Sequence, residues 1–210
     1  MTKRIILVGG GALAREIINV FNNTYPSKSS NFFKFYIDQE DTFLEDKVYQ
    51  LNYLGKINEY KPEPQDLFVL AIANPEIKQK VVKELKAKGA FFESLIHPSS
   101  FVAKTAKLGE GIVIFPMSAV SADATILSFV TINFLSTIGH DVEIGEYTTL
   151  SAHVDLTGKV LVESKCFFGT GAKVLPGITI GSSSIIGAGS IIYRNVAPNS
   201  TMYTQPAKKL

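Results

Sequence analysis

The sequence predicts an α/β domain with a Rossmann-like βαβ unit, followed by an all-β domain built as a parallel β-helix of hexapeptide repeats. Two observations predict this fold class. A hydrophobic residue recurs every six positions throughout the second half, and a glycine-rich turn joins a buried strand to a helix near the N-terminus. We expect the first domain to span residues 1–98, the β-helix residues 99–197, and a C-terminal tail residues 198–210.

The six-residue period begins at Val102 and reaches Ile192 without a polar residue and without a slip in phase. Such a period fits neither a helix of 3.6 residues per turn nor the two-residue alternation of a strand. Each hexapeptide instead supplies one short strand and one corner, and three of them close a triangular coil. The repeated aliphatic residue should fill the interior, together with a small or β-branched residue four places later, such as Ser136 or Ala172.

The composition is that of an ordinary soluble globular protein, with 46% hydrophobic residues and a net charge of +2. This charge gives no reason to expect a nucleic-acid or membrane partner. The apolar run in 3–11 is too short for a membrane span or a signal peptide, so we expect a cytoplasmic protein. The single cysteine, Cys166, falls in a small-residue slot of the period, where a buried thiol is the simplest interpretation.

The N-terminal half begins with a continuous apolar strand, Arg4–Val8, which ends in the run Gly9, Gly10, Gly11, Ala12, Leu13. A helical pattern follows, and then a second strand, Phe33–Ile37, closed by Asp38. This order is typical of a nucleotide-binding βαβ unit. The glycines let backbone N–H groups approach a phosphate, and the helix N-terminus adds a positive partial charge. Asp38 would hydrogen-bond a ribose hydroxyl or a base edge.

Three further elements are expected before the β-helix: a strand at Leu67–Ala73, a helix at Pro75–Lys88 and a strand at Phe91–Ile96. The lysines of the helix should form a solvated outer face. With fewer than a hundred residues, this half is too short for two mononucleotide-binding halves. It therefore suits a single nucleotide better than NAD.

Within the β-helix, His140 stands two places after an inward isoleucine, so its side chain should point outward from a corner. Asp141 beside it would hold one imidazole nitrogen and raise the basicity of the ring, leaving the other nitrogen to take a proton. A merely solvated corner histidine is the alternative. The other two histidines, His97 and His153, do not share one hexapeptide phase with His140, so no metal site is expected.

These motifs together resemble the sialic-acid O-acetyltransferase type of bacterial sugar acyltransferase over essentially the whole chain. That group includes N-acetyltransferases acting on UDP-, dTDP- or GDP-linked 4-amino-4,6-dideoxysugars. The residues that carry the resemblance are the glycine turn, the hexapeptides, Gly139-His140-Asp141, the run from Gly169 to Ala172, and the tail from Gln205 to Lys208.

The resemblance implies a left-handed β-helix, a homotrimer with active sites between neighbouring coils, acetyl-CoA as co-substrate and no metal. It implies that His140 is the general base, that Asp141 assists it, and that Asn133 lines the acceptor pocket. Gly9 to Leu13, with Asp38 and Gln39, would hold the nucleotide. The residues expected to face the acyl-CoA are Thr149, Thr170, Gly171, Ala188 and Lys208.

Two positions depart from the pattern of many relatives that act on UDP-amino sugars, which carry histidine where Leu13 and Thr149 stand. The nucleotide and the sugar stereochemistry therefore stay open. The expected reaction is transfer of an acetyl group to the 4-amino group of the nucleotide-linked sugar, for surface glycan biosynthesis. Transfer to a sugar hydroxyl, as in a sialic acid, is one alternative, and a nucleotide-binding trimeric scaffold without turnover is another.

Overall fold

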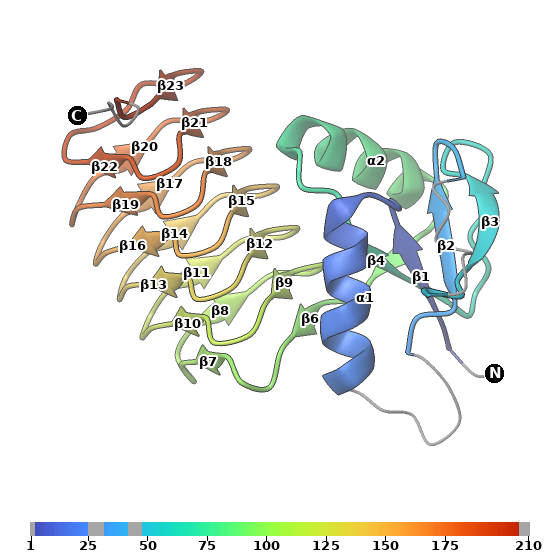
Figure 1. Cartoon of the computed structure of the whole chain (residues 1–210). Coiled ribbons are helices and arrows are strands. Elements are labelled where there is room, and N and C mark those ends of the chain that lie inside the picture. Colours follow the sequence, from blue (N-terminus) through green and yellow to red (C-terminus); the bar gives the residue numbers. More distant parts are fainter. Residues whose placement is uncertain (1–2, 25–31, 42–47, 206–210) are drawn as a thin grey trace, which may run out of the picture. The chain divides into compact units, whose positions relative to one another are not determined.

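The computed structural model describes residues 3–24, 32–41 and 48–205. The chain divides into two compact units, Met1–His97 and Pro98–Leu210. The predicted fold class is confirmed: the first unit is built on a parallel sheet with two helices, and the second is a parallel β-helix (Figure 1).

The sheet of the first unit has the strand order β3-β2-β1-β4-β5, and all its strands are parallel. Its core includes the apolar runs of the neighbouring strands β1 and β4, where Leu7 and Val69 are fully buried. The elements are β1 (Arg4–Val8), α1 (Ala12–Thr24), β2 (Phe35–Asp38), β3 (Asn52–Lys56), β4 (Asp66–Leu70), α2 (Pro75–Ala87) and β5 (Phe91–Phe92).

The local sequence explains which face α1 buries and where α2 begins. Helix α1 buries Ala14, Ile17, Ile18 and Phe21, the spacing of one helical face. In α2, the side chain of Asn74 caps the N-terminus by accepting hydrogen bonds from two backbone N–H groups, and Pro75 follows at the first helical position. Among the described residues, neither helix is long and apolar enough to cross a membrane.

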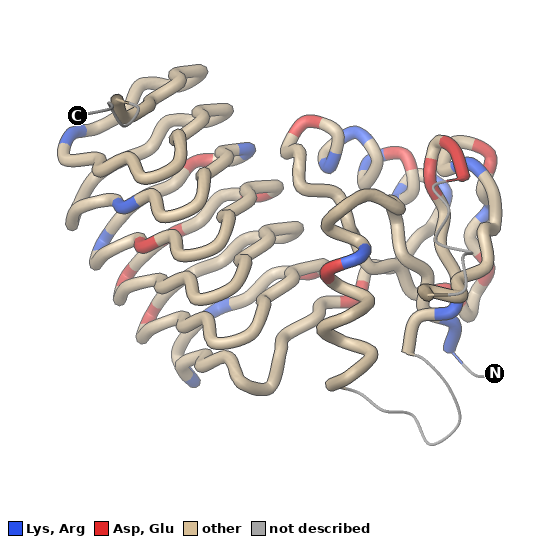
Figure 2. Tube along the Cα trace, viewed as in Figure 1, with Lys and Arg blue, Asp and Glu red and all other residues tan. Residues whose placement is uncertain are grey.

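The expectation of a fully solvated lysine face on α2 is wrong at one position. Charged residues lie all along this helix (Figure 2), but the side chain of Lys78 is completely buried. Burial lowers the pKa of its amine to about 7. The helical period in fact places Lys78 on the buried face, three, four and seven residues before Val81, Val82 and Leu85, so the expectation failed because it followed the charge of the residue and not its position.

Two strands differ from the prediction. β3 was not expected, because its sequence, NYLGK, has no buried residue and lies at an edge of the sheet. The single strand expected at 91–96 is two short strands: β5 belongs to the first sheet, whereas β6 (Leu95–Ile96) is the end strand of a β-helix sheet.

The β-helix has three sheets, in which strands one coil apart pair in parallel. The offset is 18 residues for pairs such as Thr131 with Thr149, and it shortens to 16 residues at the last pair, Ile185 with Thr201. We call the sheets C, D and E. Sheet C contains β6, β9 (Val113–Ile114), β12 (Thr131–Ile132), β15 (Thr149–Leu150), β18 (Phe167–Phe168), β21 (Ile185–Ile186) and β23 (Thr201–Met202). Sheet D contains β7 (Phe101–Val102), β10 (Ala119–Val120), β13 (Thr137–Ile138), β16 (Asp155–Leu156), β19 (Lys173–Val174) and β22 (Ile191–Ile192). Sheet E contains β8 (Lys107–Leu108), β11 (Thr125–Ile126), β14 (Glu143–Ile144), β17 (Leu161–Val162) and β20 (Thr179–Ile180).

The predicted inward positions form the core of the β-helix. From Ile114 to Ile192 every residue of the six-residue period is buried, whereas Val102 and Leu108 of the first coil are partly exposed. The small residues four places later are buried too, and several carry hydroxyls that bridge coils. Ser118, for example, donates to the carbonyl of Asn133, and Ser136 donates to that of Ser151, in each case 15 residues further along.

Candidate functional site

The glycine turn after β1 lines a pocket of about 420 Å³ in the first unit. All seven residues that were predicted to hold a nucleotide lie in its wall: Gly9, Gly10, Gly11, Ala12, Leu13, Asp38 and Gln39. The sequence did not single out the opposite wall, which follows β4 and includes Ala71, Ala73, Asn74 and Ile77.

The topology explains why the pocket is here. β1 and β4 are the central neighbours of the sheet, and the chain leaves β1 toward one edge and returns in β4 toward the other. Ligands of open parallel sheets bind at this switch point, beyond the carboxyl ends of the strands. Helix α1 begins at Ala12 in the pocket wall, so its N-terminus adds positive partial charge there.

The glycine turn is defined by a backbone conformation that requires glycine at one position and by a hydrogen bond to Asp38. Gly9 has φ of +99°, and a Cβ on it would lie 3.0 Å from Cγ1 of Ile72, so only glycine fits. The backbone N–H of Gly10 donates to Oδ2 of Asp38 at 2.8 Å, which ties the end of β2 to the turn. By contrast, a Cβ on Gly11 would have no atom within 4 Å. Gly11, which lines the pocket, therefore has open space where a side chain would stand.

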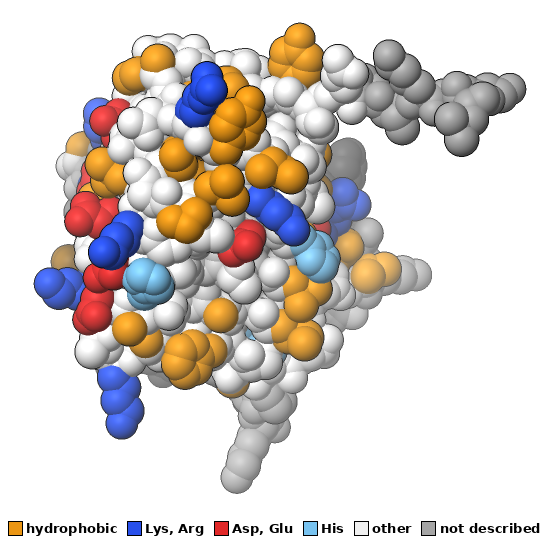
Figure 3. Space-filling view, turned by 90° about the vertical axis from the view of Figure 1, so that its left-hand side faces the viewer, with side chains coloured by type: hydrophobic (Ala, Val, Ile, Leu, Met, Phe, Trp, Pro, Cys, Tyr) orange, Lys and Arg blue, Asp and Glu red, His pale blue; other side chains and the backbone are white. Residues whose placement is uncertain are grey.

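His140 and Asp141 lie at the corner between sheets D and E, immediately after β13. Nδ1 of His140 is 2.8 Å from Oδ2 of Asp141, and the side chains are 62% and 48% exposed. The carboxylate can accept a hydrogen bond from Nδ1–H, which fixes the tautomer whose Nε2 is a proton acceptor. Figure 3 views the β-helix from the side of sheet D, where histidine side chains stand exposed among hydrophobic ones.

The other predicted β-helix residues lie elsewhere in the chain. Asn133, Thr170, Gly171 and Ala188 lie in corners between sheets C and D, so they flank the opposite edge of sheet D from His140. Within one chain, the structure does not bring the two groups together.

Three of the predicted residues need separate description. The side chain of Asn133 accepts a hydrogen bond from the backbone N–H of Phe134 and so shapes its own corner. Thr149 is buried on β15, with 4% of its surface exposed. Lys208 lies outside the described residues.

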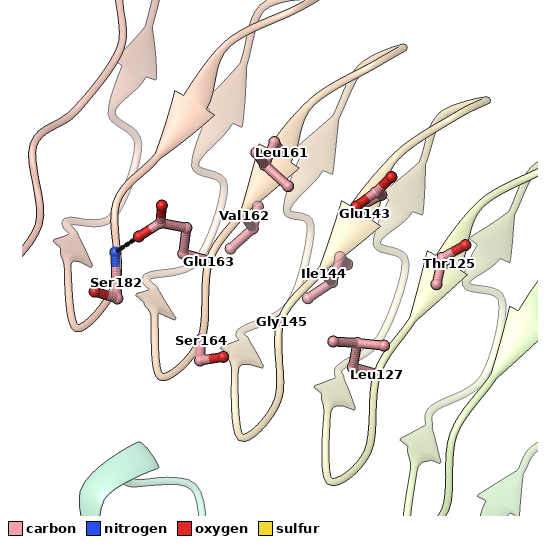
Figure 4. Close-up of a pocket in the computed structure, with 10 residues that line it drawn as sticks. All are labelled: Thr125, Leu127, Glu143, Ile144, Gly145, Leu161, Val162, Glu163, Ser164 and Ser182. Atoms are coloured by element: carbon pink, nitrogen blue, oxygen red, sulfur yellow. Dashed lines mark hydrogen bonds between the residues drawn. The ribbon is translucent and has the colours of Figure 1, made fainter.

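A second pocket, of about 370 Å³, lies on sheet E and was not predicted (Figure 4). Leu127 and Leu161 give it an apolar wall, and Glu163 accepts a hydrogen bond at 2.7 Å from the backbone N–H of Ser182 in the next coil. It contains none of the predicted site residues. Sequence periodicity could not indicate it, because its outward-facing residues follow no common type.

The remaining histidines have different surroundings. His97 is partly buried against the edge of Phe21, and its Nε2 lies 2.8 Å from Oγ1 of Thr24. Burial lowers the pKa of this imidazole. His153 is exposed at a corner between sheets C and D. In the part of the chain that the structure describes, no three His, Cys, Asp or Glu residues are grouped as metal ligands.

The chain is similar over most of its length to sugar N-acetyltransferases. It is 29% identical over 185 residues to the GDP-perosamine N-acetyltransferase of Escherichia coli O157:H7, covering 87% of this chain and 82% of that protein. No family model matches the sequence.

Solved structures extend the similarity to the whole fold. The PerB protein of Caulobacter crescentus, crystallised with CoA and GDP-perosamine, superposes with a TM-score of 0.83 at 25% identity, covering 96% of this chain and 94% of that one. WeeI of Acinetobacter baumannii superposes with a TM-score of 0.86 over the full length of both chains, and its 23% identity supports the fold alone. The resemblance identified from the sequence is confirmed.

Proposed function

We propose that this chain, which is similar to nucleotide-sugar N-acetyltransferases, acetylates the 4-amino group of a nucleotide-linked 4-amino-4,6-dideoxysugar with acetyl-CoA. The observation that carries the proposal is the exposed His140–Asp141 pair, in a chain that is similar to such enzymes over most of its length. The product would be an acetamido sugar for surface glycan synthesis. We further propose that the reaction takes place in the cytoplasm.

The nucleotide diphosphate would bind in the pocket beside the glycine turn. The open space at Gly11 lets a phosphate approach the backbone, and the N-terminus of α1 favours its negative charge. Asp38 already holds Gly10 and so shapes the turn before any ligand arrives. One of its lone-pair sites would remain to meet the ribose or the base.

The chemistry would take place at His140. The neutral amine attacks the thioester carbonyl, a C–N bond forms, and Nε2 of His140 removes a proton from the nitrogen. The C–S bond then breaks, and the leaving CoA sulfur recovers that proton from the imidazole. Asp141 keeps Nδ1 protonated, so Nε2 is the nitrogen that is available to act as the base. Orientation of two bound substrates replaces a covalent acyl-enzyme.

We propose a homotrimer because His140 lies at one edge of sheet D, whereas the predicted acceptor and CoA residues of the same chain, Asn133, Thr170 and Ala188, lie at the other edge. A neighbouring copy would bring its Thr170 and Ala188 edge to the His140 edge of the first. Sheet D and its two edges carry exposed hydrophobic side chains, as an interface between copies requires. These are Phe101, Met117, Leu135, Leu175, Ile191 and Tyr193.

The function is tested with one sugar nucleotide prepared in two forms, with an amine or a hydroxyl at C4. Release of CoA thiol with the amine and not with the hydroxyl supports N-acetylation. Faster release with the hydroxyl, or with a free sialic acid, would replace it with O-acetylation. Nucleotide binding without thiol release from any sugar would favour the non-catalytic scaffold.

The nucleotide is identified by thermal shift with UDP, dTDP and GDP, each with and without CoA. A ligand at a hundred times its Kd adds about 2.7 kcal/mol to the unfolding free energy. GDP should be tested first, because the relatives with 29% and 25% identity are both named for GDP-perosamine.

A further inference from the structure

The imidazole of His140 lies across Gly158, the residue one coil further along in the same corner position. A Cβ on Gly158 would lie 2.5 Å from Nε2 and 2.7 Å from Cε1 of His140. These distances are far below ordinary contact, so the ring occupies the space that any side chain at 158 would need.

The backbone does not require glycine at this position. Gly158 is absent from the residues with positive φ, so its conformation is one that other amino acids adopt. The same corner slot in other coils holds Ala122, His140, Pro176 and Arg194. The missing side chain at 158 is therefore explained by the ring and not by the turn.

We propose that Gly158 is a positioning residue for the reaction, because its lack of a side chain lets the ring of His140 lie against the backbone; this inference rests on the proposed function. The ring is held on two sides: Oδ2 of Asp141 meets Nδ1, and the bare backbone at 158 lies under Nε2 and Cε1. The backbone joins the two coils as well, since Lys159 N–H donates to the carbonyl of His140 at 2.9 Å. Together these contacts fix the position of the ring, with Nε2 over the backbone of Gly158.

The test is the variant Gly158→Ala. Its methyl group displaces the ring by roughly 1 Å, and a displacement of that size at a reacting group costs on the order of 10²-fold in rate. We expect kcat to fall by about that factor, with little change in KM for the nucleotide sugar, whose nucleotide binds in the other unit. The unfolding temperature should not fall, because the backbone conformation accepts alanine. Pro176→Ala, a change in the same slot one coil further on, is the matched control and should keep full activity.

A double-mutant cycle separates positioning from a general loss of structure. In a His140→Ala background there is no ring to displace, so adding Gly158→Ala should leave the residual rate unchanged. Equal loss from Gly158→Ala with and without His140 would overturn the inference, as would unchanged kcat in the single variant. If His140→Ala itself keeps full turnover, the base assignment in the proposed function fails instead.

Discussion

The carboxylate of Asp38 and the backbone N–H of Gly10 are joined by a hydrogen bond of 2.8 Å, which connects β2 to the glycine turn after β1. Asp38, which the sequence predicts as a ligand contact, thus also shapes the turn that lines the pocket. A carboxylate can serve both purposes because its two oxygens accept several hydrogen bonds.

Substitution of Asp38 should separate these two roles. Asp38→Ala removes the acceptor of Gly10 N–H, and we expect a loss of about 1.5 kcal/mol in unfolding free energy together with weaker nucleotide binding. Asp38→Asn keeps an acceptor oxygen, so most of the stability should return. Chemical denaturation and nucleotide titration of both variants measure this. Equal stability of Asp38→Ala and the wild type would show that the hydrogen bond does not hold the turn.

Gly9 and Gly11 should respond differently to alanine. At Gly9 both the φ of +99° and the contact with Ile72 oppose a side chain, so Gly9→Ala should cost about 1–3 kcal/mol in stability. Gly11→Ala meets open space, so the protein should fold normally but bind nucleotide more weakly. Thermal unfolding and a nucleotide titration distinguish the two. Normal nucleotide affinity in Gly11→Ala would place the phosphate elsewhere.

Cys166 should be inert in the folded protein. It is fully buried, and burial raises the pKa of its thiol to about 11. We expect no reaction with a thiol reagent at pH 8 until the chain unfolds. Because the folded pKa lies above the unfolded one, near 9, the thiol's contribution to stability is complete below pH 9 and is lost as the pH rises toward 11.

The variant Cys166→Ser isolates that pH dependence. The thiol contacts the carbonyl of Gly181, 15 residues further along, which is the partner that serine hydroxyls have in equivalent slots. The variant should therefore fold, and its stability should fall less than that of the wild type between pH 9 and pH 11. Parallel curves for the two proteins would contradict the shifted pKa.

Asp66 should anchor the first unit at the end of the sheet away from the pocket. Burial alone would raise the pKa of its carboxyl, but hydrogen bonds from Arg4, Tyr60 and the backbone N–H of Glu63 outweigh burial and lower it. Its contribution to stability is thus present above the unfolded pKa and lost as the pH falls through the folded one. Asp66→Ala leaves Arg4 with only the exposed carboxylate of Glu63, 3.4 Å away, and should cost about 1.5–3 kcal/mol in unfolding free energy. Urea denaturation at pH 7 measures this cost, and a loss below 1 kcal/mol would contradict it.

Ile191→Glu should disrupt the proposed trimer without unfolding the chain. Ile191 is 60% exposed on sheet D, so a charge there is tolerated in a single copy but not between copies. Light scattering should show a smaller particle, and activity should be lost with it. Leu161→Glu, on sheet E, is the control and should stay trimeric. A wild-type monomer with full activity would exclude a site shared between copies.

The β-helix was predictable because its period is a direct consequence of its geometry. The inward residue at every sixth position, from Ile114 to Ile192, can be recognised from the sequence alone, without any contact in the folded structure. The hydroxyl bridges of Ser118 and Ser136 could not be foreseen, since an inward slot specifies size and not hydrogen-bond partners. Strand β3 was not predicted, because an edge strand with no buried residue has no hydrophobic pattern in its sequence.

The glycine turn and the His140–Asp141 pair were predictable because neighbours in sequence are neighbours in space. The wall of the pocket after β4 and the space at Gly158 depend on contacts between distant segments. Such contacts follow from strand order and from the 18-residue coil, so they become visible only when the chain is folded. The same applies to the burial of Thr149.

The most direct test of the account is the turnover of His140→Ala with acetyl-CoA and a nucleotide-linked 4-amino sugar at saturating concentrations. Loss of a general base should lower kcat by about 10²–10⁴-fold, while the oligomeric state and nucleotide affinity stay the same. Wild-type turnover in a correctly folded His140→Ala protein would contradict the assignment of this imidazole as the base.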